Sequence, residues 1–180
     1  MKIYRSVRSY RRWYFTSFAL ILFIFGLLSL QVVAKSIANE DSLLVTLTNN
    51  TRTNYHLTPL KSNRQLEQAA KLKAQDMFNK QYFEHISPSG TTPWQFIKQS
   101  GYHYAFAGEN LATDFTDLDA THQAWLNSPT HRANILDNRY KDIGIASVSG
   151  QFQGRQTIIT VEMFGTSQAS SIFKEIKGLW

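Results

Sequence analysis

The stretch QAWLNSPTHRANILD, residues 123–137, predicts how one part of this chain folds and where it presents a histidine. Trp125 and its small apolar neighbours predict a helix that ends just before Ser128. Ser128 can cap a second helix, and Pro129 fits its first position because no N–H is needed there. His131 then lies in the opening turn. Taken alone, His131 is more readily explained as a structural histidine bonded to a backbone carbonyl, so other residues must decide whether it belongs to a site.

The composition predicts one domain and excludes several kinds of chemistry. A chain of 180 residues with 43% hydrophobic content can bury one substantial core. Its formal charge of +6 comes mostly from residues 2–12, which carry five of the nineteen basic residues and leave fourteen against thirteen acids. The nearly neutral remainder predicts no nucleic-acid binding. The chain has no cysteine, which excludes disulfides, thiolate metal ligands, a catalytic thiol and a lipid-modified cysteine.

The N-terminal residues have the pattern of an export signal. Basic residues precede an uncharged run from Trp13 to Ala34 that is rich in Leu, Ile and Phe, and its last residues are small enough for a cleavage site. The run is also long enough to span a bilayer, so residues 1–34 are either a signal peptide or a membrane anchor. Both alternatives predict an extracellular or cell-surface domain. It is secreted if the chain is cleaved after Ala34, and otherwise held by a single transmembrane helix at residues 13–34.

Residues 40–166 have the periodicity of a globular domain. Helices are predicted from Asp41 onward, after a cap at Ser62 or Asn63, and from Pro93. Strands are predicted over residues 104–112, 140–149 and 156–164, and the last has two apolar faces, as a central strand does. Residues 167–180 are a short C-terminal tail.

Three polar residues stand in apolar stretches of this domain. His85 lies near the end of the second helix, which Pro88 must terminate; Glu109 follows Gly108 inside a strand, and Glu162 interrupts the last strand. A buried carboxylate is costly unless it meets a cation or hydrogen-bond donors, so we expect partners for both acids. A half-buried structural His85 and a solvent-facing Glu109 are the alternatives.

Together these motifs resemble the CAP superfamily, also called the SCP-like or cysteine-rich secretory protein family. The resemblance covers about residues 40–166, and it rests on YFEH with Ser-Pro at 82–88, GENLA at 108–112, WLNSPTHRANIL at 125–136, IGI at 143–145 and VEMFG at 161–165. The chain resembles the short bacterial branch, because the disulfides of animal members are missing. Membership implies an α+β fold, a three-layer α-β-α sandwich with a small antiparallel sheet between helices and a cleft at one side.

The resemblance also implies a cleft lined by two histidines and two glutamates, which fall on His85, Glu109, His131 and Glu162. Such a set suits a divalent metal ion, zinc above all, with water in any free position. In a narrower alternative only the histidines bind metal, and the two glutamates orient them or act as a base on bound water.

Three further residues are weaker candidates for the rim of the cleft: Ser87, Tyr102 and Asn134. Ser87 beside Pro88 also suits a turn, and Asn134 also suits a bond to backbone.

The leading hypothesis is an exported CAP domain that binds a divalent metal and acts by binding a ligand at the cell envelope or outside the cell. One alternative is a metal-dependent hydrolase of peptide or cell-wall substrates, with Glu109 or Glu162 as the catalytic base. Another is a lipid-binding protein. The ligand itself, a small molecule, lipid or peptide, stays open, and we expect a monomeric domain.

Overall fold

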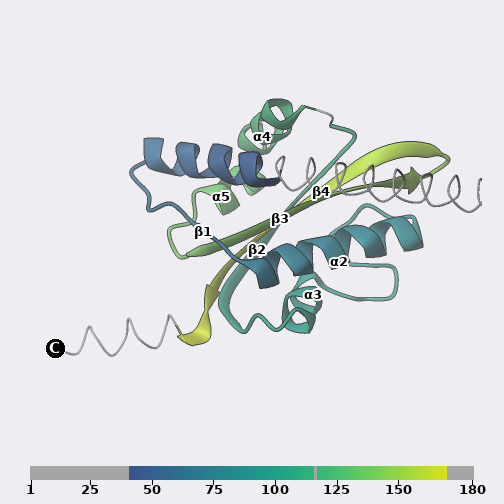
Figure 1. Ribbon diagram of the computed structural model, residues 1–180, viewed down its shortest axis with the longest axis horizontal. Coiled ribbons are helices and arrows are strands. Elements are labelled where there is room, and N and C mark those ends of the chain that lie inside the picture. The colour runs from purple at the N-terminus through teal and green to yellow at the C-terminus, as the bar shows by residue number, and fades with distance from the viewer. Residues whose placement is uncertain (1–40, 116, 170–180) are drawn as a thin grey trace, which may run out of the picture. The chain divides into compact units, whose positions relative to one another are not determined.

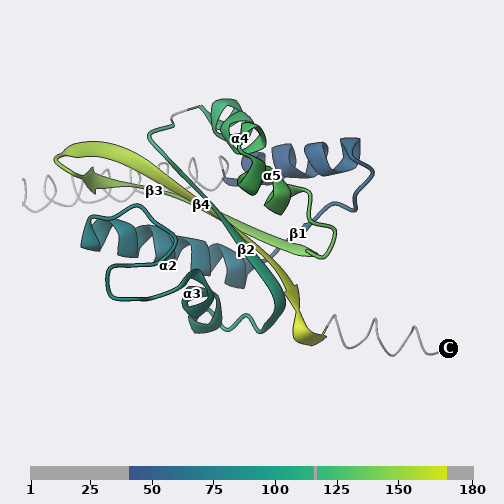
Figure 2. The same cartoon turned by 180° about the vertical axis from the view of Figure 1, so that it is seen from behind.

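The computed structural model describes residues 41–115 and 117–169, which form three layers (Figures 1 and 2). A four-stranded sheet is the middle layer. Its one face is covered by α2 (Arg64–Lys80) and α3 (Pro93–Gln99), and its other face by the helical residues 41–54, α4 (Leu118–Asn127) and α5 (Pro129–Ile135). The predicted α-β-α sandwich is confirmed. The predicted N-terminal hydrophobic helix falls outside the described residues.

The sheet has the order β1-β3-β4-β2, so β4 is central and β2 is an edge strand. Its long strands are β2 (Tyr104–Thr113), β3 (Asp142–Phe152) and β4 (Arg155–Ser167), and they pair antiparallel. A short strand, β1 (Lys61–Ser62), pairs parallel with β3. The sheet is therefore mixed and not wholly antiparallel as predicted. The sequence did not indicate β1, because two residues are too few to show the period of a strand.

Most helix starts lie where capping residues predict them. The Asn63 side chain accepts N–H bonds from Gln65 and Leu66 at the start of α2, and Asp117 caps α4. Ser128 occupies the cap position of α5, but its hydroxyl contacts Thr130 Oγ1 at 3.2 Å and bonds no backbone N–H. The predicted side-chain cap at Ser128 is therefore absent, and Pro129 and the backbone start this helix.

Gly108 in β2 is a point of close approach. A Cβ atom there would overlap the Tyr140 hydroxyl, so only glycine fits. The strand's irregular register lies elsewhere, between Tyr104 and Phe106. The sequence allows either a bulge or a close approach at Gly108, and the structure shows the close approach.

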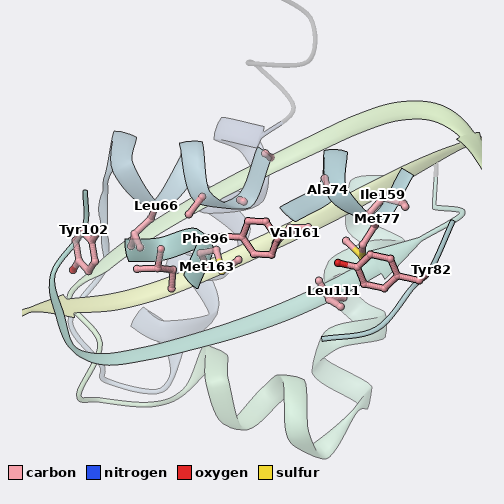
Figure 3. Close-up of a cluster of buried hydrophobic side chains, with 14 of the residues drawn as sticks. Leu66, Ala74, Met77, Tyr82, Phe96, Tyr102, Leu111, Ile159, Val161 and Met163 are labelled. Atoms are coloured by element: carbon pink, nitrogen blue, oxygen red, sulfur yellow. The ribbon is translucent and has the colours of Figure 1, made fainter. Parts of the chain in front are cut away.

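Two apolar cores lie on the two faces of the sheet. Ile159, Val161 and Met163 of β4 face α2 and α3 (Figure 3), whereas Phe164 faces the helices of the other layer. Because side chains alternate along a strand, Glu162 must face the same layer as Phe164.

Within residues 41–115 and 117–169, no helix combines the length and the apolar character needed to cross a bilayer.

Candidate functional site

His85 and Glu109 form the central contact of the site. Glu109 pairs with Met163 across β2 and β4, so its side chain faces the layer of α2 and α3. His85 lies in the loop after α2, and its Nδ1 is 2.6 Å from Glu109 Oε1. The carboxylate side chain is only 2% exposed, whereas that of His85 is 56% exposed. Glu109 thus meets the partner that its place in an apolar strand predicts.

The surroundings of this pair shift both titrations. Burial raises the pKa of Glu109, and the hydrogen bond from His85 opposes that shift. The same hydrogen bond raises the pKa of His85. The second oxygen of Glu109, Oε2, is buried without a hydrogen-bond partner among the described residues. One oxygen of this buried carboxylate is therefore unpaired, and the other binds the imidazole.

His131 lies across a cavity from His85. The cavity has a volume of about 530 Å³ and is lined by Phe83, Glu84, His85, Ile86, Leu111 and His131. Burial lowers the pKa of His131, and the nearby His85 lowers it further. The two histidines come from opposite sides of the sheet, from the α2–α3 layer and from α5, and both line the cavity beside Leu111 of the edge strand β2. Two of the four predicted residues, His85 and His131, thus line one cavity, and a third, Glu109, contacts His85.

Side chains of the α4–α5 region bind the free edge of β2. The carbonyls of Ala107, Glu109 and Leu111 accept hydrogen bonds from Tyr140 Oη at 3.1 Å, Asn134 Nδ2 at 3.0 Å and Trp125 Nε1 at 3.0 Å, in that order. An edge strand normally leaves such groups unpaired, so these three donors both cover the edge and fix α5 against it. This is how His131 is held beside the cavity.

Glu162 does not join the other three residues. It pairs with Asn110, one position away from the Glu109–Met163 pair, so it projects from the opposite face of the sheet. Thr48 Oγ1 donates to its Oε1 at 2.8 Å, and Asn110 Nδ2 donates to its Oε2 at 2.9 Å. Burial raises the pKa of Glu162 to about 7, although both hydrogen bonds oppose the shift. The expected convergence of four residues is thus not observed.

The weaker rim candidates lie elsewhere or act structurally. Tyr102 is buried and donates to Asp142 Oδ2 at 2.6 Å; Figure 3 places it at the opposite end of the apolar cluster from Tyr82. Ser87 Oγ accepts the backbone N–H of Thr91 at 3.0 Å, which stabilises a turn. Asn134 donates a hydrogen bond to the backbone carbonyl of Glu109. This agrees with the alternative prediction for Asn134, a bond to backbone.

Lys73 of α2 is a neighbour of the site that sequence reasoning missed. It is fully buried, and its Nζ donates to the carbonyls of Glu84 and His85, each at 2.7 Å. A lysine is usually taken as a solvated residue. The signal was its position: residues 66, 69, 70, 73, 74 and 77 form one buried helical stripe, and Lys73 is its single charged member.

Residues 45–164 match the model of the cysteine-rich secretory protein family, CAP. The chain belongs to this family. It is 37% identical over 124 residues to the uncharacterized protein YkwD of Bacillus subtilis, covering 68% of this chain and 48% of that protein. It is 28% identical to the uncharacterized membrane protein YlbC of the same species, over 59% of this chain and 31% of that protein. The chain thus spans about half or less of these relatives.

Solved structures show the same CAP fold. An extracellular protein with an SCP domain from Bacillus anthracis superposes with a TM-score of 0.63 at 27% identity, covering 72% of this chain and 41% of that one. An outer surface protein of Borrelia burgdorferi gives a TM-score of 0.63 at 25% identity, covering 72% of this chain and 94% of that one.

The residues of this CAP domain fit a metal only in part. Nδ1 of His85 is occupied by Glu109, which leaves Nε2 as the ring nitrogen available to a cation, as in carboxylate–histidine–zinc arrangements. His131 offers a second imidazole in the same cavity. Across residues 41–115 and 117–169, however, no three His, Asp or Glu side chains are grouped closely enough to hold one ion. Among the described residues the structure thus offers two imidazoles on one cavity, and not a four-residue centre.

Proposed function

We propose that the cavity between His85 and His131 binds a divalent cation, zinc in the first place, and that this domain acts by binding a ligand at the cell envelope or outside the cell. One observation carries the proposal. A buried carboxylate holds His85 through Nδ1, and a second imidazole lies in the same cavity. Neutral imidazoles held in this way are common zinc ligands.

The extracellular or surface location is supported by what the related proteins are called. One solved neighbour is an extracellular protein and another an outer surface protein, and one curated relative is a membrane protein. The export pattern of residues 1–34 predicts the same location.

The cavity wall supports a ligand of mixed character. Phe83, Ile86 and Leu111 present apolar surface beside the two imidazoles. A ligand that places an apolar group against these residues and a donor atom near the histidines would use both parts of the cavity.

Hydrolysis is the second candidate, and one observation favours it. Oε2 of Glu109 is an unpaired acceptor, so Glu109 has the capacity to take up a proton. Glu162 has no such capacity near the cavity, because both its oxygens are bonded on the other face of the sheet. Of the two acids, Glu109 is therefore the candidate base, and it would act beside His85.

Calorimetric zinc titration of the full chain tests the metal proposal. We expect His85→Ala and His131→Ala each to weaken zinc binding by at least about tenfold, the effect seen when a ligand's supporting partner alone is lost. His103→Ala is the matched control, because His103 is exposed and does not line the cavity. Zinc affinity unchanged in both cavity variants would reject the site.

A further inference from the structure

Lys73 occupies a position in α2 that lysine rarely takes. It is 0% exposed and belongs to the same helical stripe as Ala70, Ala74 and Met77, which fill the apolar core. Removing an ammonium group from water is costly unless its protons find acceptors. We therefore expect the buried Lys73 ammonium group to have hydrogen-bond acceptors and a structural or functional role.

All three protons of the Lys73 ammonium group have an acceptor. Nζ lies 3.1 Å from Tyr82 Oη and 2.7 Å from each of the carbonyl oxygens of Glu84 and His85. The rings of Tyr82 and Phe96 also face the cation, with centroids 4.8 Å and 5.8 Å from Nζ. Two of the three hydrogen bonds thus go to consecutive peptide groups of the loop that carries His85.

This loop has little other means of fixing the imidazole. Residues 84–86 form a bend without helix or strand pairing, and the His85 side chain is 56% exposed. The Glu109 carboxylate holds one end of the residue, at ring Nδ1, and Lys73 holds the other, at the backbone carbonyl. A fixed peptide plane sets the direction of the Cα–Cβ bond, so both anchors are needed to hold the ring in one place.

We propose that Lys73 is a positioning residue for His85: its buried ammonium group fixes the backbone of residues 84–85 and so keeps the His85 ring on Glu109 with Nε2 available to a ligand. The part of this inference that concerns zinc rests on the proposed function. The part that concerns the orientation and tautomer of His85 does not.

Lys73→Met and Lys73→Arg separate positioning from simple stabilisation. Methionine keeps an unbranched apolar side chain but removes the donors, whereas arginine keeps the cation and its donors. Lys71→Met is the matched control, because Lys71 lies on the same helix and is exposed. The readouts on the full chain are the ¹⁵N chemical shifts of the His85 ring, recorded without metal, and zinc affinity by calorimetry.

The expected result has three parts. In the wild type and in Lys71→Met, His85 holds a single tautomer protonated at Nδ1. In folded Lys73→Met this tautomer is mixed with the other, and zinc affinity falls about tenfold or more, the scale found for residues that orient a metal ligand. In Lys73→Arg, His85 keeps the single tautomer of the wild type.

Two results would overturn the proposal. One is a folded Lys73→Met protein whose His85 tautomer matches the wild type, whatever its stability. The other result comes from the wild type and applies even if Lys73→Met does not fold. It is the exchange of the Lys73 ammonium protons with water at the same rate as those of Lys71. Such exchange would show that the hydrogen bonds from Lys73 to the loop do not persist. A wild-type chain that binds no zinc but loses its His85 tautomer in Lys73→Met would reject the metal and keep the positioning role.

Discussion

Glu109 and Glu162 are the same residue type in similar apolar strands, yet the structure gives them different surroundings. Glu109 faces α2 and α3, contacts a half-exposed histidine and keeps one oxygen unpaired. Glu162 faces the helical residues 41–54, and both its oxygens accept bonds from neutral donors in the core. Glu109 pairs with Met163, and Glu162 pairs with the next residue of β2, Asn110. Because neighbouring positions of a strand face opposite sides of the sheet, one acid lies in the site and the other in the core.

Asn110 connects the two regions. Its Nδ2 donates to Glu162 Oε2 at 2.9 Å and to the His131 carbonyl at 3.2 Å, while its Oδ1 accepts from Asn134 at 2.9 Å. The core acid is therefore connected to the site through Asn110, which contacts the backbone of His131 directly and that of Glu109 by way of Asn134. Substitutions of the two glutamates should consequently differ in kind: one should change stability and the other binding.

The largest expected effect is the loss of stability in Glu162→Ala. This change leaves the Thr48 and Asn110 donors buried without their acceptor and opens a cavity, so we expect it to cost about 3–5 kcal/mol of unfolding free energy. Glu109→Ala should cost less than half as much, because its partner His85 is exposed enough to bond water. Urea unfolding at pH 6 measures both. Equal losses would contradict the distinction.

The next effect is the pH dependence of stability. The pKa of Glu162 is about 7 in the folded chain against an ordinary 4.5, so the unfolded chain releases this proton first and stability falls as pH rises from about 4.5 through 7. The difference corresponds to about 3 kcal/mol. Glutamine mimics the protonated acid, so Glu162→Gln should flatten the stability profile between pH 5 and 8.

Glu67→Gln is the control for that profile, because Glu67 is exposed on α2. Its stability should follow the wild-type pH dependence. A Glu162→Gln profile as steep as that of the wild type would show that Glu162 is ionised at pH 5 in the folded chain.

A smaller effect is expected at Asn134, which supports both regions at once. Asn134→Ala removes the donors to the Glu109 carbonyl and to Asn110 Oδ1, and we expect a loss of about 1–2 kcal/mol. Asn138→Ala, in an exposed loop, should cost less than about 0.5 kcal/mol. Thermal unfolding compares them, and equal midpoints would show that Asn134 contributes nothing to the edge of β2.

Much of the fold follows from local sequence. The caps at Asn63 and Asp117 and the Pro129 helix start are short-range features, and the apolar period of β4 predicts its central place. The two-residue strand β1 had no such pattern. It forms because the chain leading into α2 runs beside β3, which only the tertiary structure decides.

The site was harder to predict, for reasons of register and burial. Single sequences show that Glu109 and Glu162 both interrupt apolar strands, but they do not show which residues of β2 and β4 pair. That pairing decides which face each acid takes. Lys73 gives two conflicting signals in the sequence, because its charge predicts a solvated side chain whereas its place on the apolar stripe of α2 predicts burial.

A zinc titration of wild type, Glu109→Gln and Glu162→Gln at one pH tests most directly whether Glu109 has a role in binding and Glu162 a role in stability. We expect Glu162→Gln to bind zinc as the wild type does, and Glu109→Gln to bind at least about tenfold more weakly, because His85 loses the carboxylate that orients it. Equal weakening in both variants, or weakening in Glu162→Gln alone, would contradict the account.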